Sequence, residues 1–303
     1  MTSPQSRSLQ APSLSLALAP AAFVFIWSTG FIVARYGMPH APPMKFLALR
    51  YALSVGCFLL WATVSRAPWP KTRRQWLHLF VVGTLINGIY LAGVWSAVKA
   101  GMGAGLTALI VGLQPVLTAL WVSTRGARLR GAQWLGLAMG LAGLLLVVWQ
   151  KLHVGEVSAF TLTCTVISLF AITSGTLYQK RFVETCDVRT ANLLQLIAAF
   201  TVTLPFALLE PGSFHWTSQG GALNIELIGA MGWSVLGLTI GGSSLLYMLI
   251  QRGAATSVSS LFYLVPPTTA ILAWVMFSEP ISMPTVIGMA LTAAGVCLTV
   301  RRA

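Results

Sequence analysis

The chain has 303 residues, of which 56% are hydrophobic and only 8% are charged. Soluble domains normally carry about 25% charged residues, so this composition excludes a water-soluble globular protein and favours one embedded in a bilayer. The net charge of +13 is a feature of many nucleic-acid-binding proteins. Here, however, the basic residues stand in short clusters between apolar runs of roughly 20 residues, the length that crosses the hydrocarbon core. We therefore predict membrane lipid as a partner and no nucleic acid.

Apolar segments follow one another along the chain from residue 14 onward. The first, 14–36, is too long for the apolar region of a signal peptide and has no small-residue cleavage site, so we predict that it is retained as a membrane helix. Nine further segments follow, at 43–64, 75–98, 103–123, 131–150, 157–180, 188–209, 226–251, 256–277 and 283–300. The sequence therefore predicts an all-α integral membrane protein with ten transmembrane helices.

The chain contains an internal repeat. A stretch that begins at Gly101 returns 152 residues later, at Gly253, and the identical pairs at this offset include Pro115 with Pro267. Aligned prolines and glycines are informative because they set backbone geometry. Since five helices are an odd number, the second half would cross the membrane upside down. We predict two inverted five-helix repeats, with domains 14–150 and 157–301.

Basic residues divide unequally between the two sides that ten helices would create. With the N-terminus inside, fourteen lie on the inner side: Arg7, Arg66, Lys71, Arg73, Arg74, Arg125, Arg128, Arg130, Lys180, Arg181, Arg189, Arg252, Arg301 and Arg302. Five lie on the outer side, with Arg50 of the second helix included: Arg35, Lys45, Arg50, Lys99 and Lys151. Because positive charge collects on the cytoplasmic side, we predict that both termini are cytoplasmic.

Polar residues near the middle of the predicted helices are candidate substrate contacts, because a polar group in hydrocarbon costs free energy unless it meets a partner or water. The candidate substrate-binding residues are Trp27, Ser28, Asn87, Tyr90, Thr107, Gln114, Thr173, Ser243, Ser244, Tyr247 and Tyr263. A serine or threonine at this depth often bonds a neighbouring helix instead, which is worth roughly 0.6 kcal/mol. Asn87 and Gln114 are stronger candidates, since an amide has several groups to satisfy.

Prolines and glycines at a similar depth are candidate hinges: Pro115, Gly241, Gly242, Pro266 and Pro267. A kink frees backbone carbonyls that a polar ligand can use, and broken helices near the midplane are typical of transporters. Tolerated kinks without a function are the alternative. Glycines of the fifth and tenth helices, such as Gly143 and Gly295, predict close helix packing.

The sequence offers no visible catalytic site. All six acids fall in loops or at helix ends, and neither an acid/base pair nor a phosphate-cradling loop can be assembled. The four histidines never stand at i, i+4, the spacing that would suggest a metal site on a helix. We therefore predict no enzymatic activity, no catalytic residue, no metal and no cofactor. An intramembrane enzyme would require embedded His, Asp, Glu or Cys in catalytic reach, and of these only cysteines are embedded.

Ten helices, two repeats and proline in the fourth and ninth helices resemble the drug/metabolite transporter superfamily, in particular its EamA-like exporters. The stretch from Trp27 to Phe31 is similar to an opening motif of that family. Ser278-Glu279-Pro280-Ile281 resembles its loop motif, whereas the first-repeat counterpart has Ala127 in place of the acid. Within the family the chain is most similar to YddG-type exporters of aromatic and other apolar amino acids. This resemblance implies a bacterial inner-membrane location and a central cavity framed by helices 1, 3, 4, 6, 8 and 9.

The leading functional hypothesis is a secondary exporter of amino acids and related small amphipathic metabolites that works by alternating access. A nucleotide-sugar or sugar-phosphate carrier is the alternative within transport, and it would need basic residues in mid-helix to hold phosphate. Arg50 alone stands in such a place. No Asp, Glu or His lies in mid-helix to carry a proton, so we predict facilitated export.

Overall fold

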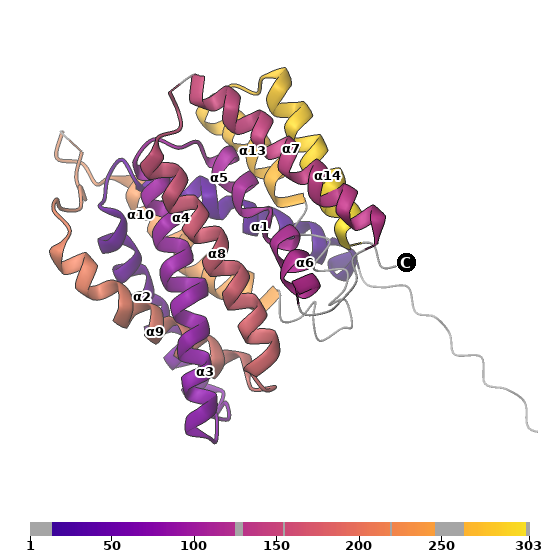
Figure 1. The fold of residues 1–303 in the computed structure, drawn as a ribbon. Helices are drawn as coiled ribbons and strands as arrows, with labels where there is room; N and C mark the ends of the chain where they lie inside the picture. Colours follow the sequence, from indigo (N-terminus) through magenta and orange to yellow (C-terminus); the bar gives the residue numbers. More distant parts are fainter. Residues whose placement is uncertain (1–13, 125–129, 154, 219, 246–263, 301–303) are drawn as a thin grey trace, which may run out of the picture.

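The computed structural model describes residues 14–124, 130–153, 155–218, 220–245 and 264–300 (Figure 1). Its α-helices are α1 (Leu14–Gly37), α2 (Pro43–Val64), α3 (Arg73–Gly83), α4 (Tyr90–Lys99), α5 (Ala104–Val111), α6 (Gln114–Thr124), α7 (Gly131–His153), α8 (Ala159–Phe182), α9 (Val188–Leu209), α10 (Ile225–Gly232), α13 (Val265–Phe277) and α14 (Met283–Val300). Two segments are π-helical, η1 (Thr84–Ile89) and η2 (Trp233–Gly242). In the described residues β pairing is limited to one isolated bridge, between Thr217 and Leu223.

Eight helical stretches in this part of the chain are long and apolar enough to cross a membrane. They are Leu18–Gly37, Pro43–Val64, Arg73–Lys99, Ala104–Trp121, Gly131–Leu152, Ala159–Phe182, Val188–Leu209 and Ile225–Leu245. Two shorter apolar helices, Val265–Phe277 and Met283–Leu298, follow them. The predicted helical residues 246–251 and 256–263 lie outside the described residues. The protein is an all-helical, multi-pass membrane protein.

The helices pair across the molecule rather than only with their neighbours in sequence. α7 packs on α14, and α2 packs on α9, at opposite sides of the body in Figure 1. Between these pairs, α5 packs on α13, α4 on α8 and α1 on η2. Each pair joins one helix from the first half of the chain to one from the second half. The contact surface between the two halves therefore runs through the whole molecule.

The third helix of each half contains a π-helical segment. In the first half η1 lies between α3 and α4, and in the second half η2 continues α10. The repeat offset of 152 residues moves Thr84–Ile89 onto positions 236–241, which lie inside η2. π-Helical turns insert an extra residue into a helix and occur frequently at functional sites. The two halves thus share a backbone irregularity at the same position.

The fourth membrane segment, predicted as a helix at 103–123 with a candidate hinge at Pro115, is broken. α5 ends at Val111 and α6 begins at Gln114. Pro115 explains the break, because proline has no N–H to bond to the Val111 carbonyl four residues earlier. The break lies against α13: a Cβ placed on Gly112 would be 2.7 Å from Cγ of Pro266.

Glycines bring α7 and α14 into close contact. A Cβ placed on Gly143 would be 2.4 Å from the carbonyl oxygen of Gly288, and one placed on Gly295 would be 2.5 Å from that of Gly136. Real Cβ atoms do not approach backbone so closely. The close packing predicted from these glycines is confirmed, since only hydrogen at these positions leaves room for the opposing backbone.

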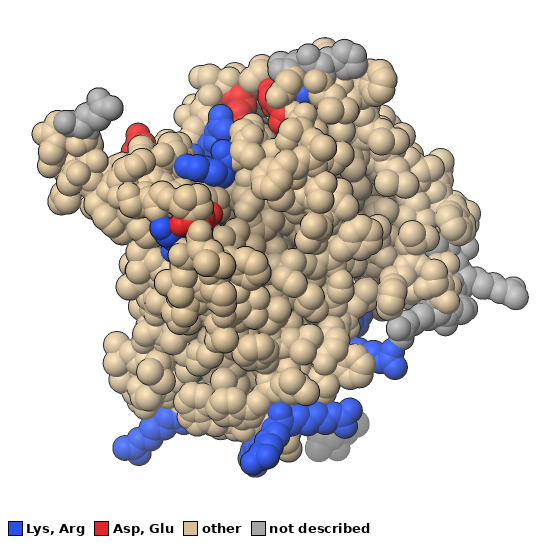
Figure 2. All heavy atoms as spheres, turned by 60° about the vertical axis from the view of Figure 1, so that its left-hand side comes forward, with Lys and Arg blue, Asp and Glu red and all other residues tan. Residues whose placement is uncertain are grey.

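Charged side chains gather at the two ends of the helical body and leave its middle apolar (Figure 2). The Glu279 end is defined by three contacts: Arg35 Nε with Glu279 Oε1 at 3.9 Å, Lys151 Nζ with Glu156 Oε1 at 2.7 Å, and His40 Nε2 with Glu226 Oε2 at 2.8 Å. The opposite end, the Arg74 end, carries the exposed basic residues Arg66, Lys71, Arg73, Arg74, Lys180 and Arg181. Between the ends large apolar side chains such as Leu60 and Leu145, both 65% exposed, face outward. This apolar surface suits contact with lipid.

Candidate functional site

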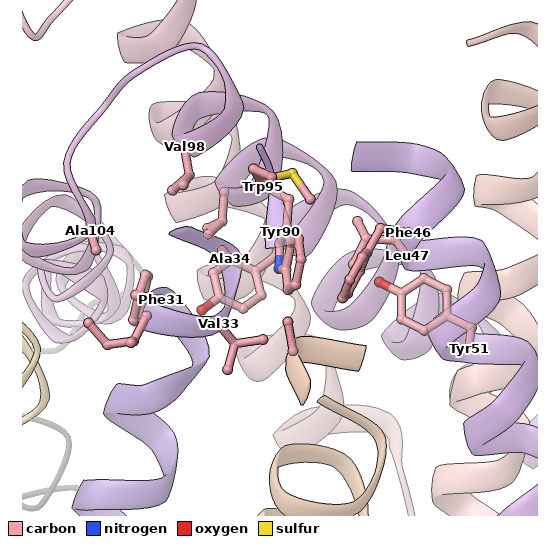
Figure 3. Packing of buried hydrophobic residues seen from close by; sticks show 14 of the residues in the cluster. Phe31, Val33, Ala34, Phe46, Leu47, Tyr51, Tyr90, Trp95, Val98 and Ala104 are labelled. Carbon is pink, nitrogen blue, oxygen red and sulfur yellow. The ribbon is translucent and has the colours of Figure 1, made fainter. Parts of the chain in front are cut away.

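The largest buried cluster joins side chains from both halves of the chain and contains two tyrosines. Phe46 and Trp95 stack there with ring centroids 4.6 Å apart, and Tyr51 and Tyr90 lie among the same apolar side chains (Figure 3). The Tyr51 hydroxyl donates a hydrogen bond to the main-chain oxygen of Asn87, which links α2 to η1. No described residue accepts from or donates to the Tyr90 hydroxyl. Polar groups are therefore available inside an otherwise apolar interior.

Arg50 is the most unusual side chain in this interior. It lies on α2, is only 8% exposed, and stands next to Tyr51 in the sequence. Its Nη2 donates a hydrogen bond of 3.2 Å to Oγ1 of Thr239, in η2. Its Nε is buried without a hydrogen-bond partner. A buried guanidinium thus has one neutral partner and a free donor.

The acids of the chain lie elsewhere. All six are in the described residues: Glu156, Glu184, Asp187, Glu210, Glu226 and Glu279. Four of them belong to the Glu279 end, where Glu210 accepts hydrogen bonds from the backbone N–H groups of Met44 and Lys45. Glu184 and Asp187 lie near the Arg74 end, where the side-chain hydrogen bond from Arg189 lowers the pKa of the Asp187 carboxyl. No carboxylate within the described residues is paired with Arg50.

The two candidate amides differ in their surroundings. Gln114, the first residue of α6 after the helix break, donates a hydrogen bond of 2.9 Å from Nε2 to Oγ1 of Thr176 on α8. Asn87, in η1, is half-buried, and its side-chain amide has no hydrogen-bond partner among the described residues. Asn87 and Thr239 occupy equivalent positions at the repeat offset of 152. The unpaired Asn87 amide is therefore the candidate most available to a ligand.

Most of the candidate serines and threonines bond within their own helices. The hydroxyl of Thr107 donates to Gly103 O at 2.9 Å, that of Thr173 to Leu169 O at 2.6 Å, and that of Ser244 to Ile240 O at 2.6 Å. Thr107 and Thr173 are also buried. Their hydroxyl hydrogens are used inside the protein, so packing explains these residues without a ligand.

The first helix is linked to α13 close to the candidate hinge prolines. The hydroxyl of Ser28 donates to the Val265 carbonyl at 3.4 Å, and the hydroxyl of Thr269 lies 3.5 Å from the Ser28 carbonyl. Pro266 and Pro267 stand between these two contacts, in the first turn of α13. The structure therefore brings Ser28 together with the hinge region.

The remaining candidates have varied positions. Trp27 is half-buried on α1 with its ring centroid 5.3 Å from that of Phe23. Ser243 is half-buried directly after η2, and Gly241 and Gly242 are the last two residues of η2. Tyr247 and Tyr263 lie outside the described residues. Some of the predicted site residues therefore lie near the irregular parts of the helices, and together they do not enclose a single binding site.

From the sequence, Arg50 was noted as the one basic residue in mid-helix but was not included among the candidate substrate contacts, and its partner Thr239 was not identified. The signal was present, because a basic residue eight positions into an apolar helix is costly and marks function by default. Thr239 gave no signal of its own, since it looks like other mid-helix threonines. Within the described residues, His, Cys, Asp and Glu side chains form no group of three that could hold a metal ion.

The Glu279 end is closed by contacts among α1, α5 and the loop after α13. Oε1 of Glu279 accepts a hydrogen bond of 3.2 Å from the backbone N–H of Ala104, the first residue of α5, and faces Arg35 of α1. A carboxylate at this point also complements the positive end of the α5 dipole. Glu279 therefore links three segments that an opening motion at this end would separate.

Comparisons with known proteins agree with a membrane transporter. The chain is 26% identical over 281 residues to a "Probable amino-acid metabolite efflux pump" of Salmonella typhimurium, covering 91% of this chain and 92% of that protein. It is 23% identical to the Escherichia coli K12 protein of the same name, over 91% of this chain and 92% of that protein. It is also 22% identical to the "Uncharacterized inner membrane transporter YedA" of Escherichia coli K12, over 83% of this chain and 79% of that protein.

The fold and the family are shared more widely. One solved crystal structure superposes with a TM-score of 0.64 at 19% identity, covering 93% of this chain and 96% of that chain, which shows a common fold. The sequence pattern of the EamA-like transporter family matches residues 14–149 and 159–301, nearly the whole chain. Helices that are long and apolar enough to cross a membrane agree with this match, and the chain belongs to the EamA-like transporter family.

Proposed function

We propose that the protein is a secondary transporter that exports amino acids and related small amphipathic metabolites by alternating access. The observation that carries this proposal is the buried Arg50, whose Nε has no hydrogen-bond partner, together with the half-buried Asn87, whose side-chain amide bonds no described residue. Such groups are costly unless a polar ligand or water compensates them. The relatives named as amino-acid metabolite efflux pumps support the direction of transport and the substrate class.

We further propose that the two halves, 14–150 and 157–301, are inverted repeats of five helices each. The pairing of helices between the halves supports this arrangement, because α2 with α9 and α7 with α14 are counterparts of each other, and α13, the counterpart of α6, packs on α5 of the same membrane segment. The π-helical segments at equivalent positions support it too. The break beside Pro115 and the Pro266–Pro267 pair would then be equivalent hinges between the two alternating states.

The proposed orientation places both termini in the cytoplasm of a bacterial cell and the Glu279 end in the periplasm. The exposed basic cluster at the Arg74 end supports it through the positive-inside rule. An inner-membrane transporter among the relatives supports the location.

Counterflow in proteoliposomes tests the function. Vesicles loaded with an unlabelled amino acid are expected to accumulate the same labelled amino acid transiently, with apolar and aromatic amino acids giving the fastest rates. A zwitterion that moves alone transfers no net charge, so neither an imposed membrane potential nor a pH gradient should drive its accumulation. Exchange of a sugar phosphate, with no exchange of any amino acid, would replace this function by that of a phosphorylated-sugar carrier.

Replacing Asn87 with alanine is expected to lower amino-acid counterflow by roughly tenfold, because the substrate would lose one hydrogen bond to its charged group. The Asn87 side chain makes no hydrogen bond to any described residue, so the apparent melting temperature of the variant should stay unchanged. Asn192→Ala is the matched control, because the Asn192 amide donates to Val188 O in its own helix and stands near the Arg74 end. Equal transport by wild type and Asn87→Ala would remove Asn87 from the substrate path.

A further inference from the structure

We propose that Arg50 binds the carboxylate group of the transported substrate. This inference rests on the proposed transport function and adds to it the chemical group that the interior recognises. It starts from an imbalance: Arg50 is only 8% exposed, its Nε has no partner, and its single described hydrogen bond is to the neutral Thr239. An uncompensated buried cation is among the costliest features a protein interior can hold.

The protein itself supplies no anion for this site. Every acid of the chain lies in the described residues, and the acids nearest the membrane interior are engaged elsewhere: Glu279 by Ala104 and Arg35, and Glu156 by Lys151. The side chain that the guanidinium does contact is the neutral hydroxyl of Thr239. An anion that compensates Arg50 must therefore come from outside the chain.

The single charge limits the class of that anion. Among the described residues, Lys151 is the other basic side chain with less than 9% exposure, and it is paired with Glu156. One guanidinium matches a carboxylate, which carries one negative charge and can accept two parallel N–H bonds from an arginine. A phosphate ester carries nearly two charges and would require further cations. The single charge therefore points to a carboxylic acid.

The contacts around Arg50 suggest how the two charged groups of a zwitterion would be bound, one by each half of the chain. Arg50 bonds Thr239 in η2, while Tyr51, the next residue, bonds the main chain of Asn87 in η1. Asn87 and Thr239 are equivalent positions of the repeat, so one residue pair of α2 contacts the same level of both halves. A substrate carboxylate at Arg50 leaves the side-chain oxygen of Asn87 to accept a hydrogen bond from the substrate ammonium group.

Ligand-dependent thermal stability of the purified protein in detergent tests the inference. Each acid is compared with its own amide: L-phenylalanine with L-phenylalaninamide, L-leucine with L-leucinamide, and hydrocinnamate with hydrocinnamamide. Wild type is expected to bind the acids about tenfold more tightly or better, and Arg50→Gln should bind acid and amide equally. Arg50→Lys keeps the positive charge and should keep part of the preference for acids over amides. This variant therefore provides a second test if Arg50→Gln folds poorly.

The variant Thr239→Val distinguishes carboxylate binding by Arg50 from a purely structural role of Arg50. If Arg50 served only to hold η2 through Thr239, then Thr239→Val and Arg50→Gln would both weaken acid and amide to the same degree. If Arg50 binds the carboxylate, Thr239→Val retains the preference for acids. A wild type without any preference, or an Arg50→Gln variant that keeps it, would overturn the inference. A preference seen with hydrocinnamate but with neither amino acid would support Arg50 and reject amino acids as the substrate.

Discussion

Replacing Glu279 with alanine is expected to open the Glu279 end about tenfold more often. The carboxylate holds the N-terminus of α5 through Ala104 N–H and lies 3.9 Å from Arg35 Nε. An anion on a helix N-terminus is worth about 0.3–1 kcal/mol, and a partly exposed ion pair adds about 0–1 kcal/mol. A free-energy difference of about 1.4 kcal/mol changes an equilibrium constant tenfold. Under the proposed alternating access, losing both contacts should therefore raise the ratio of open to closed molecules at this end roughly tenfold.

Cysteine labelling measures this shift. Thr107 lies one turn inside α5 and is fully buried, so Thr107→Cys should react slowly with a membrane-impermeant maleimide applied from the side of the Glu279 end. Adding Glu279→Ala is expected to raise that rate about tenfold, and Glu279→Gln should raise it less because its oxygen still accepts from Ala104. Glu226→Ala is the control, since Glu226 contacts only His40 at the same end. Equal rates in all backgrounds would show that Glu279 does not hold this end closed.

Gly143→Ala is expected to lower the free energy of unfolding by about 2 kcal/mol, the middle of the range for overpacking a tight interior. The new methyl group would stand 2.4 Å from the Gly288 carbonyl oxygen and 2.8 Å from the backbone nitrogen of Thr292. Backbone atoms of α14 cannot turn away as a flexible side chain could, so the two helices must separate. The effect should appear as an apparent melting temperature several degrees lower in detergent.

Gly56→Ala is the matched control for this effect. Gly56 also lies inside a membrane helix, α2, but it is exposed and a Cβ there would meet nothing within 4 Å. Alanine favours helix more than glycine does, so Gly56→Ala should leave stability unchanged or slightly raised. If both variants melted alike, the α7–α14 contact would be looser than the described packing.

Several features were predictable because they depend on local properties of the sequence. The apolar runs have the length of the hydrocarbon core, and for the helices that lie wholly within the described residues they gave the bounds to within a few residues. Gly143 and Gly295 indicated a close helix contact without identifying the partner backbone. Pro115 marked the irregular part of the fourth helix, although the complete break at Gly112–Leu113 was not foreseen. The resemblance to EamA-like transporters was correct at the level of the family.

The ranking of site residues depended on contacts that local sequence does not contain. Thr107 and Thr173 were predicted as substrate contacts from their depth alone, and only the structure shows that each donates its hydroxyl to a carbonyl of its own helix. Arg50 was visible in the sequence as a basic residue in mid-helix, but its burial and its neutral partner were not. Whether a polar side chain at a given depth finds hydrogen-bond partners depends on neighbours that come from another helix.

The sequence by itself therefore determined that this protein lies in a membrane and where most of its helices run, and Pro115 marked the irregular fourth helix, because hydrophobic length and the geometry of proline act over a few turns. The tertiary structure alone decided which polar groups lack partners. Arg50 meets Thr239 across 189 residues of chain and meets no acid at all. Whether a buried charge is compensated depends on everything that packs around it, and that is settled only when all the helices are in place.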